Sequence, residues 1–461
     1  MPSIVSANHL GADAMKLISD TVEVGTVKGP AHTPIYPVSK VELWNPAVFT
    51  KGPPIEAFAE LRTASPVAWN DEPEDRPGFW SVTGYNDVMK VNADYETFSS
   101  QRGGILMGTQ RSEMQLARAS MDAMINMDAP NHMQLRMEHM PYFTPAYLRA
   151  LTQKVEVEVT RLLDAMASQG RCDLVAALSS QLPLFTLCEI LGVPVEDRPK
   201  FLTWMHFLEM ANSFAAERSG TSGGMEGAAA DLPPEAKMFL DAFQAAISEM
   251  FEYGRHMLHK RRLDPQHDLM SAIARAQVDG ALLADEYLDG SWLLIVFAGN
   301  DTTRNTISGA MELLTQFPDQ KAKLIARPEL TPGAVNEIIR MVSPVIYMRR
   351  TATRDTEVGG QKIAEGEKVI MYYGAANRDP AIFANPDQFD IERANADKHI
   401  AFGYGPHTCI GKQVAKLQLE AVYRQILARF PDIRQSGPKD VAANNFVYAI
   451  RSMPVEFTAV K

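Results

Sequence analysis

The stretch that decides the fold reads Phe402-Gly403-Tyr404-Gly405-Pro406-His407-Thr408-Cys409-Ile410-Gly411 and lies near the C-terminal end of the chain. Its glycines predict a tight turn that presents Cys409. The helix formers from Val414 to Leu419 predict a helix just after the turn, and the N-terminal dipole of such a helix favours a thiolate. The segment is therefore predicted to run as turn, cysteine and helix.

A thiolate that binds iron needs hydrogen-bond donors around its sulfur, and the backbone N–H groups of a glycine turn supply them without crowding a flat cofactor. Gly405 and Gly411 suit this purpose, and Phe402 would shield the sulfur from water. A lone cysteine is more commonly a small buried hydrophobic residue, but the spacing Phe-x-x-Gly-x-x-x-Cys-x-Gly favours a ligand. This spacing resembles the cysteine-loop signature of the cytochrome P450 family, which implies a haem b group with Cys409 as the iron ligand.

Composition and charge bound the class of protein. The 461 residues carry 45 Lys and Arg against 56 Asp and Glu, a formal net charge of −11, which argues against a nucleic-acid-binding surface. Residues 1–25 have no continuous apolar core, and the longest apolar run, Trp292–Ala298, is too short to span a bilayer. We therefore expect a cytoplasmic protein without a membrane segment, and we expect a monomer.

The source of electrons is indicated by what the sequence lacks. Only Cys172, Cys188 and Cys409 are present, which excludes a disulfide framework and a four-cysteine iron–sulfur cluster, and no glycine-rich nucleotide fingerprint occurs. Electrons must then come from another protein, and the resemblance implies a ferredoxin with an NAD(P)H-dependent ferredoxin reductase. Lys412 and Lys416, one turn apart, are either a basic contact for an acidic ferredoxin or two solvated lysines.

The order of elements predicts a mainly α-helical chain with a minor β region, as the cytochrome P450 fold requires. The proline-broken residues 1–40 are predicted to form an irregular N-terminal arm, and residues 41–461 a single domain. The glycine-rich stretch 219–230 is either an interdomain linker or a mobile loop that closes over a substrate pocket. From Asp285 to about Gln316 the pattern predicts one long central helix, which by resemblance crosses the haem.

The middle of this helix carries Ala298-Gly299-Asn300-Asp301-Thr302-Thr303. Two small residues leave room beside the helix, and a threonine side chain can disturb the local backbone hydrogen bonds and hold a water. The simpler interpretation is an ordinary helix with surface polar residues, but a carboxylate beside the apolar run 293–297 is costly unless it has a function. The hexapeptide resembles the family's oxygen-activation motif, which implies that Asp301 delivers protons and Thr302 orients water.

Haem carries two propionates, whose burial requires cationic or hydrogen-bonding partners. His132 and Arg136 stand at i and i+4, on one face of a predicted helix. A lone histidine is more often an ordinary core or surface residue, but the pair resembles the family's H-x-x-x-R propionate clamp.

By the same resemblance Arg350 and His407 complete the cationic set, and Phe402 and Gly403 are further cofactor contacts. Arg349 is a rival to Arg350, because the two are adjacent and the sequence does not separate them.

The pattern Glu337-Ile338-Ile339-Arg340 is by itself commonly a solvated ion pair. The downstream segment 385–393, however, resembles the family's meander. This resemblance implies that Arg393 joins Glu337 and Arg340 in a buried network that holds the core beneath the haem.

These motifs follow the family's order, and the resemblance implies a monooxygenase that uses O2 to hydroxylate an unactivated C–H bond of a hydrophobic substrate. Mostly apolar segments are expected to line the pocket: 103–127, the helix around Leu294, Phe297 and Ala298, and the stretches 345–348 and 445–448. Strings such as 299–305 look most like bacterial alkane and fatty-acid terminal hydroxylases, so we expect terminal hydroxylation of a medium-chain alkane or fatty acid.

Other functions stay open. A terpenoid or a steroid side chain is the alternative substrate, because hydroxylases of these molecules share parts of the same strings. A peroxide-driven peroxygenase fits less well, because such enzymes typically lack the acid and alcohol that Asp301 and Thr302 supply. A non-catalytic haem protein has no need of a proton relay.

Overall fold

The computed structural model describes residues 22–25, 36–73, 76–108, 119–205, 207–208, 234–278 and 280–460. The stretch 219–230, most of the predicted arm and part of the expected substrate segment 103–127 lie outside the described residues.

Helices form most of the architecture, as the sequence predicts. Their bounds are α2 Ile55–Ala64, α3 Tyr85–Ala93, α5 Asn131–His139, α6 Pro145–Met166, α7 Gln181–Leu191, α9 Pro234–Leu263, α10 Leu269–Arg275, α11 Asp285–Gln316, α12 Pro318–Ala326, α13 Thr331–Val342, α14 Tyr373–Ala376 and α15 Lys412–Arg429. The strands are β1 Val22–Gly25, β2 Tyr36–Ser39, β3 Val67–Asn70, β4 Phe79–Val82, β5 Phe98–Ser99, β6 Arg171–Asp173, β7 Gln277–Val278, β8 Ala281–Leu282, β9 Tyr347–Ala352, β10 Thr356–Val358, β11 Gln361–Ile363, β12 Lys368–Tyr372, β13 Arg434–Gln435, β14 Asp440–Val441, β15 Ile450–Ser452 and β16 Pro454–Glu456.

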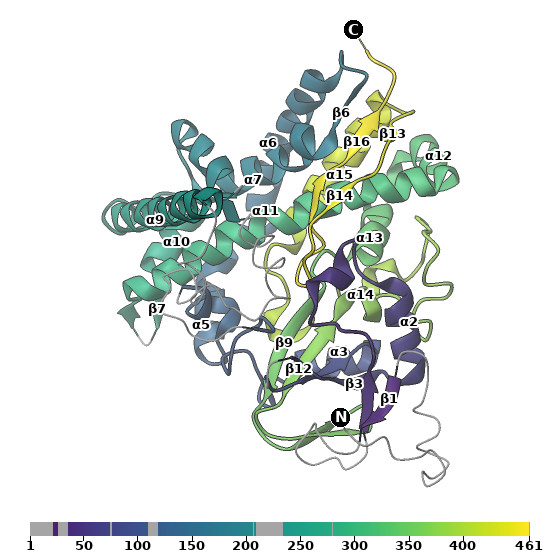
Figure 1. Cartoon of the computed structure of the whole chain (residues 1–461). Helices are drawn as coiled ribbons and strands as arrows, with labels where there is room; N and C mark the ends of the chain where they lie inside the picture. Colours follow the sequence, from purple (N-terminus) through teal and green to yellow (C-terminus); the bar gives the residue numbers. More distant parts are fainter. Residues whose placement is uncertain are drawn as a thin grey trace.

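The long helix α11 organises the molecule. It spans 32 residues, about 48 Å at the usual rise, and runs through the middle of the structure in Figure 1. It ends at Gln316 because Phe317 leaves the helical conformation and Pro318 begins α12. The predicted central helix is thus confirmed at both ends.

The β region is a seven-stranded sheet in the order β1-β2-β3-β4-β12-β9-β5, with smaller two- and three-stranded sheets beside it. Strand β12 pairs parallel with β4 and antiparallel with β9, and this register sets Val369 opposite Arg350. Strands β1 and β2 fall within residues 1–40, so the expectation of irregular chain is wrong for 22–25 and 36–39. The boundary of a single domain at residue 41 stays a prediction.

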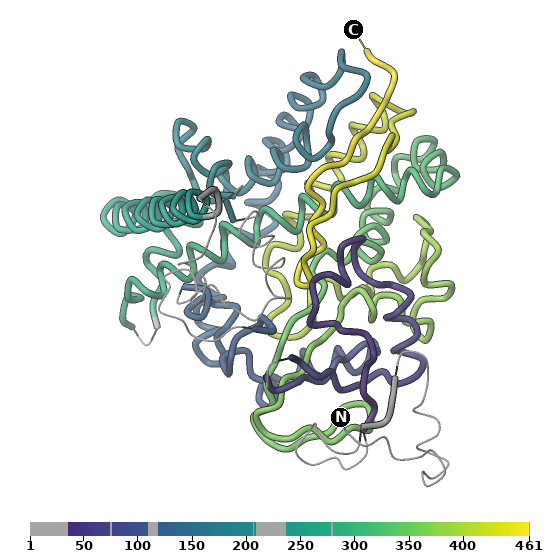
Figure 2. Tube along the Cα trace, viewed as in Figure 1, coloured from purple at the N-terminus to yellow at the C-terminus, as the bar shows by residue number. Residues whose placement is uncertain are grey.

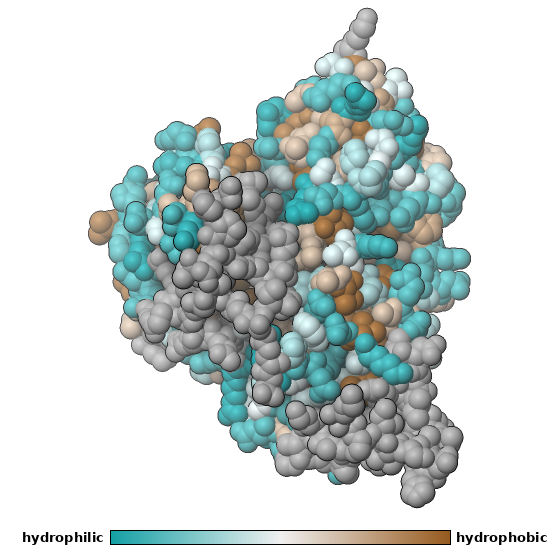
Figure 3. All heavy atoms as spheres, viewed as in Figure 1, coloured by the Kyte–Doolittle hydropathy of each residue, from teal (hydrophilic) through white to brown (hydrophobic). Residues whose placement is uncertain are grey.

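Two groups of buried apolar side chains stabilise the fold. The larger lies among the helices around α11, and the smaller surrounds β3, β4, β9 and β12. The tube in Figure 2 shows the C-terminal segment beside the chain near α6, where β16 pairs with β6. Apart from the grey atoms, the face drawn in Figure 3 is largely hydrophilic with small hydrophobic areas. In the described part of the chain, no helix is long and apolar enough to cross a membrane.

A buried ionic network ties α13 to the loops that precede the cysteine. Arg340 donates to both carboxylate oxygens of Glu337, at 2.7 and 2.8 Å, and Arg393 donates to Glu337 at 3.0 Å. Arg340 also donates to the carbonyl oxygens of Asn377 and Pro386, each at 2.8 Å. The predicted network is confirmed, and it locks together segments that are far apart in the sequence.

We predict that Glu337→Ala destabilises the protein by about 3–5 kcal/mol, because it leaves two arginines buried without their carboxylate. Chemical unfolding of the holoprotein measures this loss. Glu329→Ala is the matched control, since Glu329 pairs with Arg327 on the surface at 3.3 Å and its removal should change the unfolding midpoint far less. Equal losses in the two variants would contradict a dominant role for the buried network.

Candidate functional site

The cysteine loop is a tight turn that ends at the N-terminus of α15, as predicted. The N–H of Cys409 donates to the carbonyl of Phe402 at 2.9 Å and closes the loop. Gly403 and Gly405 have φ values of 73° and 72°, a region that favours glycine. A Cβ at Gly405 would also lie 2.8 Å from the backbone oxygen of Asn92. The glycines are therefore required by the turn and by the close approach of α3.

The sulfur of Cys409 is open on one side only. The side chain is exposed where it faces a cavity, while protein atoms surround it elsewhere, and this desolvation raises the pKa of the thiol. A hydrogen bond from the N–H of Gly411 and the charges of Arg136 and Lys412 act in the opposite direction. Gly411 is thus a donor to the sulfur, as expected, whereas Gly405, the other expected donor, packs against α3.

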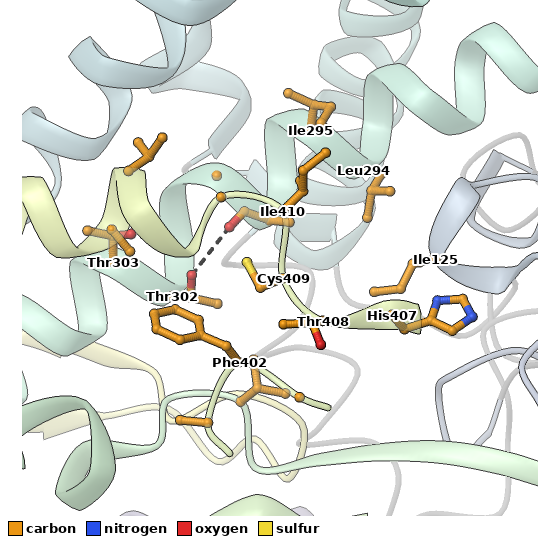
Figure 4. A pocket seen from close by; sticks show the side chains of 18 of the residues that line it. Ile125, Leu294, Ile295, Thr302, Thr303, Phe402, His407, Thr408, Cys409 and Ile410 are labelled. Atoms are coloured by element: carbon orange, nitrogen blue, oxygen red, sulfur yellow. Dashed lines mark hydrogen bonds between the residues drawn. The ribbon is translucent and has the colours of Figure 1, made fainter. Parts of the chain in front are cut away.

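The cavity has a volume of about 260 Å³ and is bounded by the cysteine loop, α11, α5, α7 and β9. In Figure 4, Phe402, His407 and Cys409 come from the loop, and Leu294, Ile295, Thr302 and Thr303 come from α11. Of the predicted site residues, those that line the cavity are His132, Arg136, Thr302, Arg350, Phe402, Gly403, His407 and Cys409. Only Asp301 among the predicted residues is not part of the lining.

The cationic and imidazole side chains meet at one side of the cavity. His132 and Arg136 extend from α5, and the His132 ring stacks on that of His407 with centroids 3.8 Å apart. Arg136 donates to the carbonyl of Thr408 at 2.5 Å, next to Cys409. The pairing of β9 with β12 places Arg350 in the same group.

The structure separates the two adjacent arginines of β9. Arg350 lines the cavity and is buried. Arg349 points to the opposite side, where it donates to the carbonyl of Leu106 at 3.3 Å and approaches Gly103. Alternation of side chains along a strand accounts for the difference.

This side of the cavity suits an anionic group. Burial lowers the pKa of His407 to about 2, and the charges of Arg350, His132 and Arg136 contribute. Burial also lowers the pKa of His132 to about 4, with a contribution from the charges of Arg136 and Arg350. Burial also lowers the pKa of both arginines. No Asp or Glu occurs among the described lining residues. The charge of Asp128 acts on His132 and Arg350 from outside the lining, but the two arginines leave net positive charge at the cavity, which fits carboxylates such as the propionates of haem.

On α11, the small residues and threonines adjoin the cavity. Ala298 and Gly299 line it, and the hydroxyl of Thr302 lies 3.3 Å from the carbonyl of Ala298. A Cβ at Gly299 would lie 3.1 Å from Leu187 of α7, which also lines the cavity. The expected room beside the helix is therefore present on the cavity face.

Asp301 lies on a different face of α11 from the cavity. Its carboxylate is 2.9 Å from the guanidinium of Arg304, one turn along, and both side chains are buried. Burial raises the pKa of Asp301 to about 7, while contact with Arg304 favours the ionised form. The carboxyl group of Asp301 is thus one residue from Thr302 along the chain, but it points toward Arg304 and not into the cavity.

The remaining wall is apolar and only partly as predicted. Met124, Ile125, Leu294, Val345 and Met348 line it, from segments expected to do so. Phe297 and residues 445–448, also expected, are not part of the lining.

Some lining residues were not predicted. They include Thr186, Leu187 and Ile190 of α7, Leu269, and the polar pair Asn92 and Tyr373. They reach the cavity through tertiary packing, for which the sequence carries no local signal.

Comparison with known proteins agrees with this site. Residues 79–455 match the family described as Cytochrome P450. A linalool 8-monooxygenase of Pseudomonas putida is 32% identical over 424 residues, covering 91% of this chain and 99% of the relative. A steroid C26-monooxygenase of Mycolicibacterium smegmatis is 33% identical over 420 residues, covering 91% of this chain and 96% of the relative.

Solved structures show the same fold. A cytochrome P450 of Mycobacterium marinum in complex with pseudoionone has a TM-score of 0.79 at 32% identity, and the match covers 92% of this chain and all of that one. Because the sequence and structural matches extend over most of the chain, the protein belongs to the cytochrome P450 family and is a haem b-binding monooxygenase.

Proposed function

We propose that this monooxygenase hydroxylates the end of an apolar medium-chain molecule, an alkane or a fatty acid, with O2 and electrons from a ferredoxin. The observation that carries the proposal is the cavity itself, in which one cysteine faces threonines of α11 and an apolar wall. The site assignments and the substrate class below are parts of the same proposal.

Haem, when bound, supplies dioxygen binding and the oxidation of a C–H bond. Cys409 is the proposed iron ligand, supported by its open side, by the N–H of Gly411 and by its place before α15. Phe402 lines the cavity together with Cys409 and is proposed to shield the sulfur from water, and the positive φ of Gly403 allows the turn.

His132, Arg136, Arg350 and His407 are the proposed propionate partners, for the reason of charge given above. Arg350 takes this part rather than Arg349, because Arg350 alone of the two lines the cavity.

The proposed proton path runs from Asp301 to the cavity by way of Thr302. A carboxyl with a pKa near 7 both accepts and releases protons at neutral pH. Its contact with Arg304 must break for the carboxyl to turn toward Thr302. The Thr302 hydroxyl then holds a water or passes the proton on the cavity side of α11. The Asp301–Arg304 contact would thus control when Asp301 delivers its proton to the cavity.

A specific observation favours a second substrate class. The names of the two relatives specify oxidation at carbon 8 of linalool and at carbon 26 of a steroid. The wall of Met124, Ile125, Leu294, Val345 and Met348 would accept either a linear chain or a terpenoid or steroid side chain. A terpenoid or steroid side chain is therefore the second candidate.

The proposal also includes a ferredoxin as the electron donor, a monomeric state and a cytoplasmic location. The ferredoxin is supported by the absence of any nucleotide fingerprint from the sequence. Lys412 at the start of α15 and Lys416 one turn later adjoin the cysteine loop, which suits contact with an acidic partner.

The decisive test of the iron ligand is the spectrum of the reduced protein with carbon monoxide. We expect a strongly red-shifted Soret band in the wild type and its loss in Cys409→Ala. Cys172→Ala is the control, because Cys172 lies on β6 away from the cavity and should leave the band unchanged. Persistence of the band in Cys409→Ala would refute the proposed ligand.

The proton path predicts a pH dependence. The oxidation rate of the wild type, measured at saturating electron donor, should fall as pH rises through about 7, since the protonated fraction of Asp301 decreases. Asp301→Asn should be about 10²-fold to 10⁴-fold slower and show no such slope between pH 6 and 8. Asp289→Asn is the control. Asp289 lies on α11 like Asp301 and also pairs with an arginine, Arg255 of α9, but it is not part of the cavity lining. A slope retained in Asp301→Asn would exclude this acid.

Substrate choice is tested by the spin-state shift of the haem on adding alkanes, fatty acids, terpenes and steroids. We expect medium-chain aliphatics to give the tightest binding, and Leu294→Trp to weaken it about tenfold by filling the wall. Phe297→Trp, on the same helix but outside the lining, should have less effect. A shift confined to terpenes or steroids would replace the first candidate by the second.

A further inference from the structure

Among the polar side chains that line the cavity and have no assigned role, Tyr373 and Asn92 form a hydrogen-bonded pair. They are 3% and 1% exposed, and the Tyr373 hydroxyl donates to Oδ1 of Asn92 at 3.1 Å. Asn92 is fixed in turn, because its Nδ2 donates to the carbonyl of Val88 at 3.0 Å. The hydroxyl is therefore aimed by a partner that is itself held by α3.

The pair lies between Arg350 and the cysteine loop. Tyr373 begins α14 directly after β12, the strand that pairs with the strand of Arg350. A Cβ on Gly403 would lie 3.7 Å from the Tyr373 hydroxyl and 4.0 Å from Oδ1 of Asn92, so the loop passes over both side chains. Burial raises the pKa of Tyr373, and the charge of Arg350 opposes that rise, as expected for near neighbours.

The chemistry at this position complements that of the cations. A carboxylate accepts about four hydrogen bonds. A further buried cation would repel the two arginines, whose charges already contribute to the lowered pKa values of His132 and His407. A phenol adds a donor without adding charge. Tyr373 can turn its single O–H from Oδ1 of Asn92 to an anion beside Arg350, so Asn92 holds the hydroxyl only while no anion takes that hydrogen bond.

We propose that Tyr373 is the neutral donor on the anion-binding side of the cavity, with its hydroxyl moving its hydrogen bond from Asn92 to a haem propionate next to Arg350. This inference rests on the proposed placement of the propionates. The competing explanation is a hydrogen bond that only links α3 to α14.

The test compares Tyr373→Phe with Tyr372→Phe in the holoenzyme. Tyr372 is the neighbouring residue, is also buried, and has a hydroxyl without a hydrogen-bond partner in the part of the chain that the structure describes; it is not part of the cavity lining. Transfer of haem to excess apomyoglobin should be about tenfold faster in Tyr373→Phe, the loss of one bond to a charged group, and unchanged in Tyr372→Phe. Asn92→Leu removes only the competing acceptor and should leave transfer near the wild-type rate, and the midpoint potential should become more negative in Tyr373→Phe alone.

Equal transfer rates in Tyr373→Phe, Tyr372→Phe and the wild type would overturn the proposal. So would a lower unfolding temperature of Tyr373→Phe with unchanged transfer and potential, since that is the result of a purely structural link. The variant Arg350→Met tests separately whether the propionates lie beside Arg350 at all. If Arg350→Met also leaves haem transfer unchanged while the wild type shows the red-shifted carbon monoxide band, the propionates lie elsewhere and the placement itself is wrong.

Discussion

Positive charge buried beside a single cysteine is the constraint on which the rest of this structure depends. Arg350 is buried and Arg136 half-buried, and burial together with the charges of these arginines lowers the pKa of His132 and His407. Desolvated charge of one sign is costly unless an anion accompanies it. In the proposed arrangement the propionates and the thiolate would together offset the guanidinium groups, and folding and cofactor binding would then be coupled.

The constraint explains why rigid elements from distant parts of the chain converge at the site. Arg136 comes from α5, Arg350 from β9 and Cys409 from the loop before α15. Each must be placed to within fractions of an ångström for the charges to balance around one group. The Glu337 network supplies part of this rigidity, because Arg340 and Arg393 tie α13 to the backbone before the cysteine loop. Its ionic groups satisfy one another and take no part in the cavity.

Sequence predicted those features that local pattern determines. The bounds of α11, the turn at Cys409 and the Glu337–Arg340 pair each depend on residues close together in the chain. Features that depend on tertiary contact were missed. Strands β1 and β2 form where prolines suggested irregular chain, because each gains backbone partners from a neighbouring strand. Likewise, Arg349 and Arg350 lie on opposite faces of β9, and the sequence does not show which face meets the cavity. Tyr373 reaches the cavity because the preceding strand, β12, pairs with β9.

The position of Asp301 follows from the same balance of charge. A carboxylate in the lining would neutralise part of the cationic side and would place a charge beside the apolar wall at Leu294 and Val345. The contact with Arg304 avoids both, because it keeps the carboxylate paired on another face of α11. On the proposed path, a proton would reach the cavity only when that pair opens, while the wall at Leu294 and Val345 stays uncharged for substrate. A cavity without acidic side chains in its described lining is therefore suited both to an anionic cofactor and to a hydrophobic substrate, and the proposed catalytic acid is kept just outside it.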